Sequence, residues 1–358
     1  MPTDDDVLPP AARDALDARL RGWERERDLS AAVLVTRSGR TAFEGCYGWA
    51  DRAAGVPVTP GTRFGLASVT KMFTAVAVAD LVVAGGLTFE DPVVRVLPPH
   101  RRPSTLRPDV TIHHLLTHTS GIADYSEEDP DSPGYVADYG ALWDERPSYR
   151  MERPADFLPM FGDLPPLRPP GERWQYSNAG YVLLGLVIEE VAGRPYTDVV
   201  QDRVFDRAGM TRSGFFRLDE ARPEVAVGYL PRRSPEEPWR SNVYRVPVLG
   251  GPDGGAFSTT GDVDRFLRTY SEGTLLGPVR EIVLARHVDA GDGFFSGYGV
   301  LHYPDGRWGH GGGDPGVEVL VQRFPAQDVQ VVVLCNGEGL AGDVRDAVLA
   351  AWRGSPES

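Results

Sequence analysis

The sequence predicts an α+β protein in which the two ends of the chain form one antiparallel sheet and the middle is a mainly helical insertion. Strand-like patterns gather near both termini, and they cover residues 31–36, 41–49, 298–303, 317–324 and 329–336. A chain of 358 residues is too long for one ordinary hydrophobic core. We therefore predict a sheet domain from residues 1–66 plus 285–358, a mainly helical domain from residues 67–284, and an active site at the seam.

The first elements follow from residue spacing. Leu16, Leu20 and Trp23 recur every three or four residues, which predicts an amphipathic helix over 10–28 that packs on the sheet. A turn at 37–40 joins the first two strands into a hairpin. Residues 69–83 are small and apolar on every side, which predicts a helix that is buried all round and ends near the glycine pair at 85–86.

The middle and the C-terminal part contain further helical patterns. They cover residues 179–191 before Gly193, residues 196–205, residues 260–271 with Thr260 as the cap, and residues 342–352. Residues 124–172 are irregular and rich in Pro and Asp, and they carry the aromatic side chains Tyr125, Tyr135, Tyr139, Trp143 and Tyr149. Two interpretations of these aromatic residues stand equal: they line a substrate cleft, or they anchor the loop.

Composition limits the partners and the compartment. Apolar residues make up 41% of the chain and charged residues 25%, as in soluble globular proteins, and no apolar run is long enough to span a bilayer. A net charge of −14 opposes nucleic acid and anionic membranes as partners. The acidic start of the chain predicts a cytoplasmic protein, in which Cys46 and Cys335 are free thiols packed as small apolar groups.

Two histidines raise the question of a metal. His114 and His118 are four residues apart and would share one face of a short helix in residues 111–122. The His-Glu-x-x-His pattern of zinc hydrolases is missing, so capping and core contacts are the favoured interpretation. We predict neither a metal nor a cofactor.

The strongest chemical signal is Lys71, because it is the only lysine and the other 36 basic side chains are arginine. Guanidinium does not give up its proton in a protein, whereas a buried amine does. Ser68 lies three residues earlier, so the start of a buried helix would place both side chains on one face. We predict that Ser68 is a nucleophile activated by Lys71. The competing interpretation is a capping serine beside a solvated lysine.

Tyr176 and Asn178 form a second motif. Tyrosine has an ordinary pKa of about 10, and a nearby Lys71 cation is expected to lower it enough for Tyr176 to carry protons. Asn178 has both a donor and an acceptor, which suit it to hold Lys71 and a substrate together. Taken alone, this motif would also fit a packed tyrosine and a helix cap at Asn178.

The third motif is His310 followed by three glycines. It lacks the Gly-Lys-Ser/Thr ending of a phosphate loop, and a strand rather than a helix follows it. Glycines here would let a strand edge lie against substrate. We predict that His310, Gly312 and Gly313 bind substrate, with the Gly313 and Ser68 N–H groups as oxyanion donors.

These motifs, together with the segments at residues 115–121, 170–181 and 254–262, resemble the serine β-lactamase and penicillin-binding-protein superfamily. The resemblance is closest to the class C branch, which also holds DD-peptidases, D-aminopeptidases and family VIII carboxylesterases. It implies that Ser68 attacks an acyl substrate, a small molecule or a peptide, and that Lys71 and Tyr176 relay protons. Which of the two takes the serine proton is open.

The sequence departs from the β-lactamase pattern at His310, where that family usually has lysine. Histidine is mostly neutral at pH 7, so it holds a penicillin carboxylate less well than a lysine does. The Gly-x-Ser-x-Gly motif of α/β-hydrolases is also missing. We therefore predict a cytoplasmic serine hydrolase of esters or amides. The alternatives are an acyltransferase, or a binding or sensor protein that is acylated without turnover.

Overall fold

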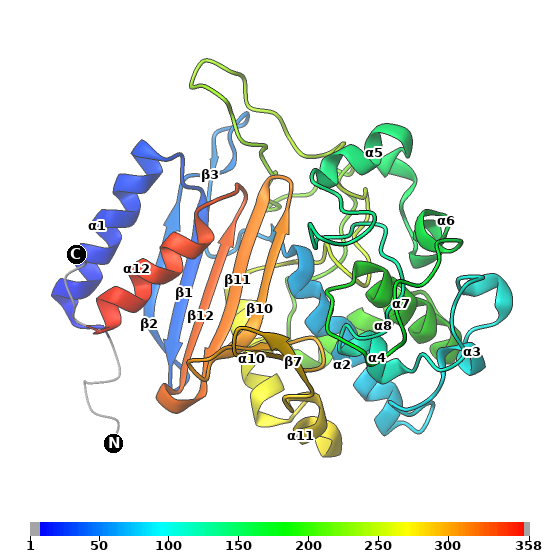
Figure 1. Ribbon diagram of the computed structural model, residues 1–358. Helices are drawn as coiled ribbons and strands as arrows, with labels where there is room; N and C mark the ends of the chain where they lie inside the picture. Colours follow the sequence, from blue (N-terminus) through cyan, green and yellow to red (C-terminus); the bar gives the residue numbers. More distant parts are fainter. Residues whose placement is uncertain (1–7, 354–358) are drawn as a thin grey trace.

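A computed structural model describes residues 8–353 (Figure 1). Its main feature is an antiparallel sheet of eight strands in the order β2-β1-β12-β11-β10-β9-β8-β7, so strands from both ends of the chain lie side by side. The strands are β1 (Ala31–Arg37), β2 (Arg40–Tyr47), β7 (Val288–Gly291), β8 (Phe294–Ser296), β9 (Leu301–His302), β10 (Trp308–Asp314), β11 (Val317–Phe324) and β12 (Val329–Cys335). The predicted α+β class and the shared sheet are confirmed.

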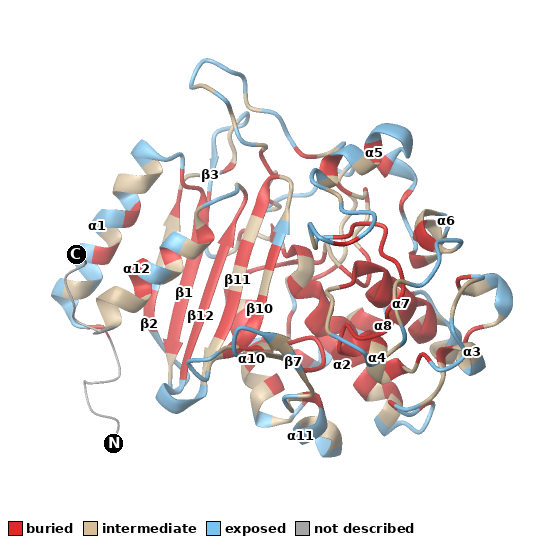
Figure 2. Cartoon of the chain, viewed as in Figure 1, coloured by how far each residue is buried: buried red, intermediate tan, exposed pale blue. Residues whose placement is uncertain are grey.

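Helices cover both faces of the sheet. On one face α1 (Pro10–Glu26) and α12 (Ala341–Arg353) pack on Ala31, Val33 and Val35, and on the other α10 (Thr260–Glu272) packs near Ala32 and Leu34. Both sets of β1 side chains are therefore buried, which explains why this strand is continuously apolar. Figure 2 shows the buried strands between helices whose outer sides are exposed.

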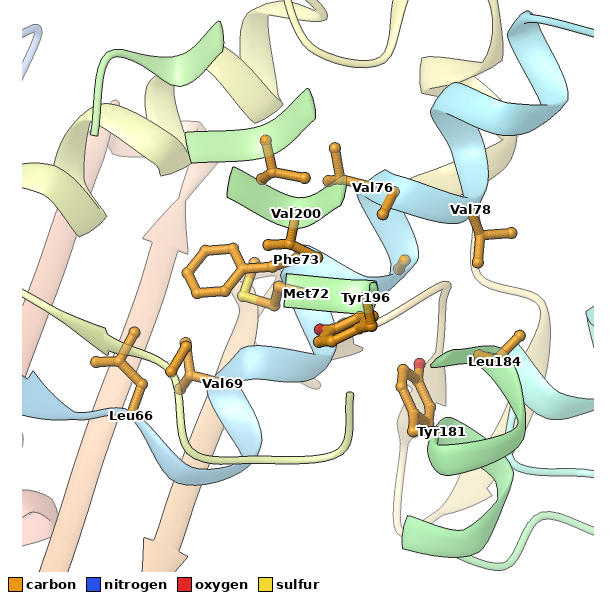
Figure 3. Close-up of a cluster of buried hydrophobic side chains, with 14 of the residues drawn as sticks. Leu66, Val69, Met72, Phe73, Val76, Val78, Tyr181, Leu184, Tyr196 and Val200 are labelled. Atoms are coloured by element: carbon orange, nitrogen blue, oxygen red, sulfur yellow. The ribbon is translucent and has the colours of Figure 1, made fainter. Parts of the chain in front are cut away.

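The helical region is built around α2 (Thr70–Val83), which packs against α7 (Asn178–Ala192) and α8 (Tyr196–Val200). Figure 3 shows side chains from these helices in one apolar cluster. The Phe73 ring makes edge contacts with the rings of Phe205 and Phe266, at centroid distances of 5.0 and 4.7 Å. The prediction of a helix buried all round is confirmed for residues 70–79, whereas Val83 in the last turn is exposed. The smaller helices are α3 (Val93–Val96), α4 (Ile112–Leu116), α5 (Leu142–Glu145), α6 (Leu158–Phe161), α9 (Asp206–Ala208) and α11 (Arg280–Val283).

Short strand pairs complete the structure. They are β3 (Trp49–Asp51) with β4 (Val56–Pro57), and β5 (Phe64–Gly65) with β6 (Phe257–Ser258). The β5–β6 pair ties the segment before Ser68 to the chain just before α10. The predicted strand over 298–303 is shorter than expected, because only Leu301 and His302 pair with their neighbours. The strands β7 and β8 were not predicted from the sequence.

Two predicted helix caps are each one residue away from the observed cap. Thr259 rather than Thr260 caps α10, since its side chain accepts a hydrogen bond from the Asp262 N–H. Ser177 caps α7 by accepting from the Gly180 N–H at 3.0 Å. The interpretation of Asn178 as a helix cap is therefore wrong, and its amide is available for other contacts.

The predicted division into two domains stays a prediction. Helix α10 lies in the range assigned to the helical domain but packs on β1 and β12, and one apolar core joins residues from both ranges. Cys46 and Cys335 are free thiols, as predicted. Within residues 8–353 no helix has the length and apolarity to cross a membrane. The acidic start of the chain, which carried the cytoplasmic prediction, lies outside the described residues.

Candidate active site

Ser68 lies in a 3₁₀ turn, η2 (Ala67–Val69), that runs directly into α2. Neither η2 nor α2 has a side-chain cap, so the interpretation of Ser68 as a capping serine is wrong. Ala67, just before it, has a φ of 43°, a conformation that a residue with a Cβ rarely adopts. Such strain at a single turn is common where a fold must present a reactive side chain. Ser68 is half-buried and lines a cavity of about 840 Å³.

Lys71 is fully buried one helical turn from Ser68. Its Nζ lies 3.1 Å from Ser68 Oγ, 2.7 Å from Asn178 Oδ1 and 2.6 Å from the Asp253 carbonyl oxygen. Burial lowers the pKa of this amine, and the surrounding carboxylates, with Asp253 the strongest, oppose that shift. The interpretation of Lys71 as a solvated surface cation is therefore wrong.

The three partners of Lys71 are not equivalent. An amide oxygen and a backbone carbonyl only accept hydrogen bonds, so Asn178 and Asp253 take two N–H bonds of the amine. A neutral amine has only two N–H bonds, and these point to Asn178 and Asp253. Its lone pair is then directed at the third neighbour, Ser68 Oγ. This geometry suits an amine that accepts the serine proton.

Contacts around α7 hold Asn178 in place. Its Nδ2 donates to Glu128 Oε1 at 3.1 Å, which directs its oxygen toward Lys71. Asp124 accepts from the backbone N–H groups of Ala179 and Ser126, at 3.1 and 2.9 Å, at the start of the same helix. These two carboxylates fix the helix terminus that carries the amide.

Tyr176 reaches the same site. Its ring stacks on His118 at a centroid distance of 4.6 Å, and Lys71 Nζ lies 4.8 Å from the ring centroid. The side chain is only partly buried by surface area, but desolvation around its hydroxyl raises the pKa well above the ordinary value. Glu128 adds to this rise, and a hydrogen bond with Ser68 opposes it. The prediction that Lys71 lowers the pKa of Tyr176 is wrong in direction, and the group is a neutral phenol.

The two histidines that were considered as metal ligands lie in different surroundings and have different hydrogen-bond partners. His114 Nδ1 accepts from the Thr111 N–H at 3.1 Å in a capping box at the start of α4. His118 lies beyond α4 at a φ of 58°, where its Nδ1 accepts from the Ser177 N–H. The capping and core interpretation is confirmed. Among residues 8–353 no cluster of three or more His, Cys, Asp or Glu side chains is arranged to hold a metal.

The β10 strand forms the opposite wall of the cavity. β9 pairs with β10 only at Trp308 and Gly309, so residues 310–314 have a strand partner on the β11 side alone. His310, Gly311 and Gly313 line the cavity. Burial, and secondarily Lys71, lower the pKa of His310 to about 4, so its ring is neutral at pH 7.

Gly312 and Gly313 are in different surroundings. A Cβ on Gly312 would lie 2.4 Å from the Leu66 carbonyl oxygen, so the absence of a side chain lets β10 pack against the turn before Ser68. A Cβ on Gly313 would meet no atom within 4 Å. Gly312 is not among the cavity-lining residues, and the substrate contacts predicted for both glycines stay predictions.

Some aromatic residues of the 124–172 segment line the cavity, and others anchor the segment, so each of the two interpretations holds for part of the set. Tyr125 and Tyr139 line the cavity, whereas Trp143 is buried against Tyr139 and Phe157. Tyr135 and Tyr149 are exposed. The segment therefore both lines the cavity and anchors itself.

Five acidic side chains line the cavity, and the sequence analysis singled out none of them: Glu127, Glu128, Asp129, Asp253 and Asp314. Glu127 accepts a hydrogen bond from Gln175, and Asp129 pairs with Arg173. Asp314 directly follows the glycines of the third motif, and Asp253 directly precedes one of the segments that carry the resemblance. Acidic side chains are common in this chain, so their position in sequence gave no signal of a shared site.

Comparison with known proteins identifies the family. The beta-lactamase family model matches residues 19–353, which is nearly the whole described chain. The chain belongs to the beta-lactamase family. It is thus a serine hydrolase within the serine β-lactamase and penicillin-binding-protein superfamily.

Three similar proteins indicate the range of this family. A penicillin-binding protein structure from Bacillus halodurans is 38% identical with a TM-score of 0.85, and the match covers 92% of this chain and 99% of that one. Esterase EstB from Burkholderia gladioli is 39% identical over 219 residues, which cover 60% of this chain and 54% of EstB. A D-stereospecific amidohydrolase structure from Streptomyces sp. is 27% identical with a TM-score of 0.75, covering 97% and 99% of the two chains. The match spans only about half the length of EstB.

Proposed function

We propose that this enzyme hydrolyses esters or amides through an acyl-enzyme on Ser68, with Lys71 as the base that takes the serine proton. The observation that carries the proposal is the arrangement of Lys71 Nζ, 3.1 Å from Ser68 Oγ and held by two groups that only accept hydrogen bonds. Because burial lowers the pKa of the amine, its neutral form is accessible.

In the proposed acylation, Ser68 Oγ bonds to the substrate carbonyl carbon while its proton moves to Lys71 Nζ. The carbonyl oxygen becomes an oxyanion, for which the backbone N–H groups of Ser68 and Gly313 are the proposed donors. The resulting ammonium has three donors for the three acceptors that already surround it. Collapse of the intermediate releases an alcohol or amine, and water then attacks the acyl carbon and regenerates Ser68.

Tyr176 is the proposed proton donor to the leaving group. Desolvation keeps its phenol protonated, so it has a proton to give, and its hydrogen bond with Ser68 places it beside the reacting atoms. Lys71 then returns the serine proton to the phenolate oxygen. This division of roles makes Lys71 the base and Tyr176 the acid during acylation.

Neutral His310 favours an esterase or amidase over a β-lactamase. A neutral imidazole in this buried position does not offer a cation to the carboxylate of a penicillin. Two relatives, named as an esterase and as a D-stereospecific amidohydrolase, support this choice.

The test is turnover of p-nitrophenyl esters, p-nitroanilides and a chromogenic cephalosporin, with Ser68→Ala as the control. We expect hydrolysis of an ester or anilide by the wild type, slow or no cephalosporin turnover, and none of these activities in the variant. A stable adduct on Ser68 without turnover would contradict hydrolysis and indicate a binding protein. Activity that appears only with an added alcohol or amine would indicate an acyltransferase instead.

A further inference from the structure

Five acidic side chains line the cavity, and we name three of them, Glu128, Asp253 and Asp314, the carboxylate wall. They come from the 124–172 segment, from the loop before β6 and from the end of β10, so the fold brings them together from distant parts of the chain. All three act electrostatically on Lys71. Glu128 is linked to Lys71 through a single side chain, because Asn178 bonds to both of them.

The oxygen atoms of this wall are poorly supplied with donors. Within residues 8–353, Asp314 receives no hydrogen bond, and Glu128 receives one, from Asn178. Asp253 is buried, and only one of its two carboxylate oxygens has a donor, the Tyr125 hydroxyl. Carboxylates in an enclosed site are normally paired, because an unpaired buried charge is costly. Each of these three residues lines the cavity, so a bound substrate is the candidate donor for their unpaired acceptors.

Lys71 is the cation that opposes the rise in the pKa values of Asp253 and Asp314. The one arginine in the cavity lining, Arg173, forms an ion pair with Asp129 at 3.0 Å. His310 is neutral at pH 7, and the neutral form of Lys71 is the one needed for the proposed chemistry. Three acidic side chains against one amine leave an excess of negative charge near Ser68 once Asp314, with its pKa of about 7, loses its proton, and this excess favours a cationic substrate over an anionic one.

Another part of the cavity lining is apolar. It is formed by Phe157 of the 124–172 segment, by Phe216, Leu218 and Val246 from the chain between α9 and β6, and by Phe257 of β6. These surfaces favour an aliphatic or aromatic side chain on the substrate.

We propose that the preferred substrate carries an ammonium group close to the scissile carbonyl, as in an α-aminoacyl ester or amide, and that the carboxylate wall binds this ammonium. This inference rests on the proposed acyl-enzyme function of Ser68. The free oxygen of Glu128 is the first partner, because Asn178 already joins this side chain to the catalytic lysine. Asp314 supplies a second carboxylate. The apolar lining takes the side chain of the same acyl group.

The test compares p-nitroanilides that share a phenyl side chain and differ in charge. They are the derivatives of D- and L-phenylalanine, of uncharged 3-phenylpropionic acid, and of anionic N-succinyl-phenylalanine. We expect kcat/KM for at least one phenylalanine enantiomer to exceed that of the uncharged compound about 10- to 100-fold, the effect of one hydrogen bond between charged groups. The anionic compound should be the poorest.

Substitutions in the carboxylate wall test whether it causes the preference for a cationic substrate. Glu128→Gln keeps an oxygen for Asn178, and Asp314→Asn changes a carboxylate with no hydrogen bond, so each should lower the cationic-to-uncharged ratio of kcat/KM. Glu145→Gln is the matched control, because Glu145 is exposed in the same segment and outside the cavity lining, and its ratio should match the wild type.

Two results would overturn the inference in distinguishable ways. Equal or faster hydrolysis of the uncharged compound, abolished by Ser68→Ala, would reject the ammonium preference and leave the hydrolase function intact. Failure of every compound, together with no adduct on Ser68, would reject the proposed function and the inference with it.

Discussion

The two sides of the cavity differ in how completely their polar atoms are paired. Around Lys71 every contact is made within the protein, and its three partners lie 2.6 to 3.1 Å away. The carboxylate wall has the opposite character, since Asp314 accepts no hydrogen bond in the described chain. Preorganised contacts suit a group that moves protons, because they need no rearrangement during the reaction. Carboxylate oxygens without a donor in the protein suit a surface that binds a ligand, because the ligand can supply the missing donors.

Breaking the paired side should give the largest effect. We expect Lys71→Arg to lower kcat/KM by about 10²- to 10⁴-fold, because guanidinium does not accept the serine proton. The measurement is steady-state kinetics on the best ester or anilide, with circular dichroism to confirm folding. Activity close to that of the wild type would mean that Lys71 acts only as a fixed charge.

Gly312 and Gly313 of β10 are neighbours in different surroundings, so the same substitution at each of them can be compared. Gly312→Ala should destabilise the protein by about 1–3 kcal/mol, because the added Cβ would lie 2.4 Å from the Leu66 carbonyl oxygen. Gly313→Ala meets open space and should leave stability within about 0.5 kcal/mol of the wild type. Urea unfolding of both variants tests this. Equal stability of the two variants would show that β10 does not press on the turn before Ser68.

Asp314, in the carboxylate wall, should make the stability of the protein depend on pH. Burial and the nearby Asp253 raise the pKa of Asp314 to about 7, from an ordinary value of 3.8. The folded state thus keeps a proton that the unfolded chain releases, so this group lowers stability progressively as pH rises from about 4 to 7.

Asp314→Asn removes this cost. At pH 8 we expect the variant to be more stable than the wild type by about 1 kcal/mol, allowing for the partial exposure of the side chain, and this gain should vanish near pH 4. Thermal unfolding at the two pH values measures the difference. A variant that is less stable at pH 8 would show that the Asp314 carboxylate has a stabilising partner.

Local sequence patterns were sufficient to predict the contact between Ser68 and Lys71. Ser68 and Lys71 are one turn apart on a helix, so their contact follows from helix geometry once the apolar run around them predicts a buried helix. The shared sheet was also predictable, because β1, β11 and β12 have clear apolar strand patterns. The caps at Thr259 and Ser177 were each misplaced by one residue, since neighbouring polar residues offer equivalent caps in sequence.

The other side of the site depends on distant segments. Glu128, Asp253 and Asp314 meet only because the chain folds, and acidic residues are too frequent in this sequence to indicate which of them converge. The direction of the Tyr176 pKa shift was predicted wrongly for a related reason. Proximity to a cation was foreseeable from the motif, but the desolvation that outweighs it arises from packing that the motif does not specify.

Rapid-quench intact-mass spectrometry of the full chain during ester turnover shows whether Ser68 carries the acyl group. We expect the wild type to gain the mass of the acyl group, peptide mapping to place it on Ser68, and Ser68→Ala to gain no such mass. Lys71→Arg should form the same adduct more slowly. An adduct on another residue, or turnover that persists in Ser68→Ala, would show that Ser68 is not the nucleophile.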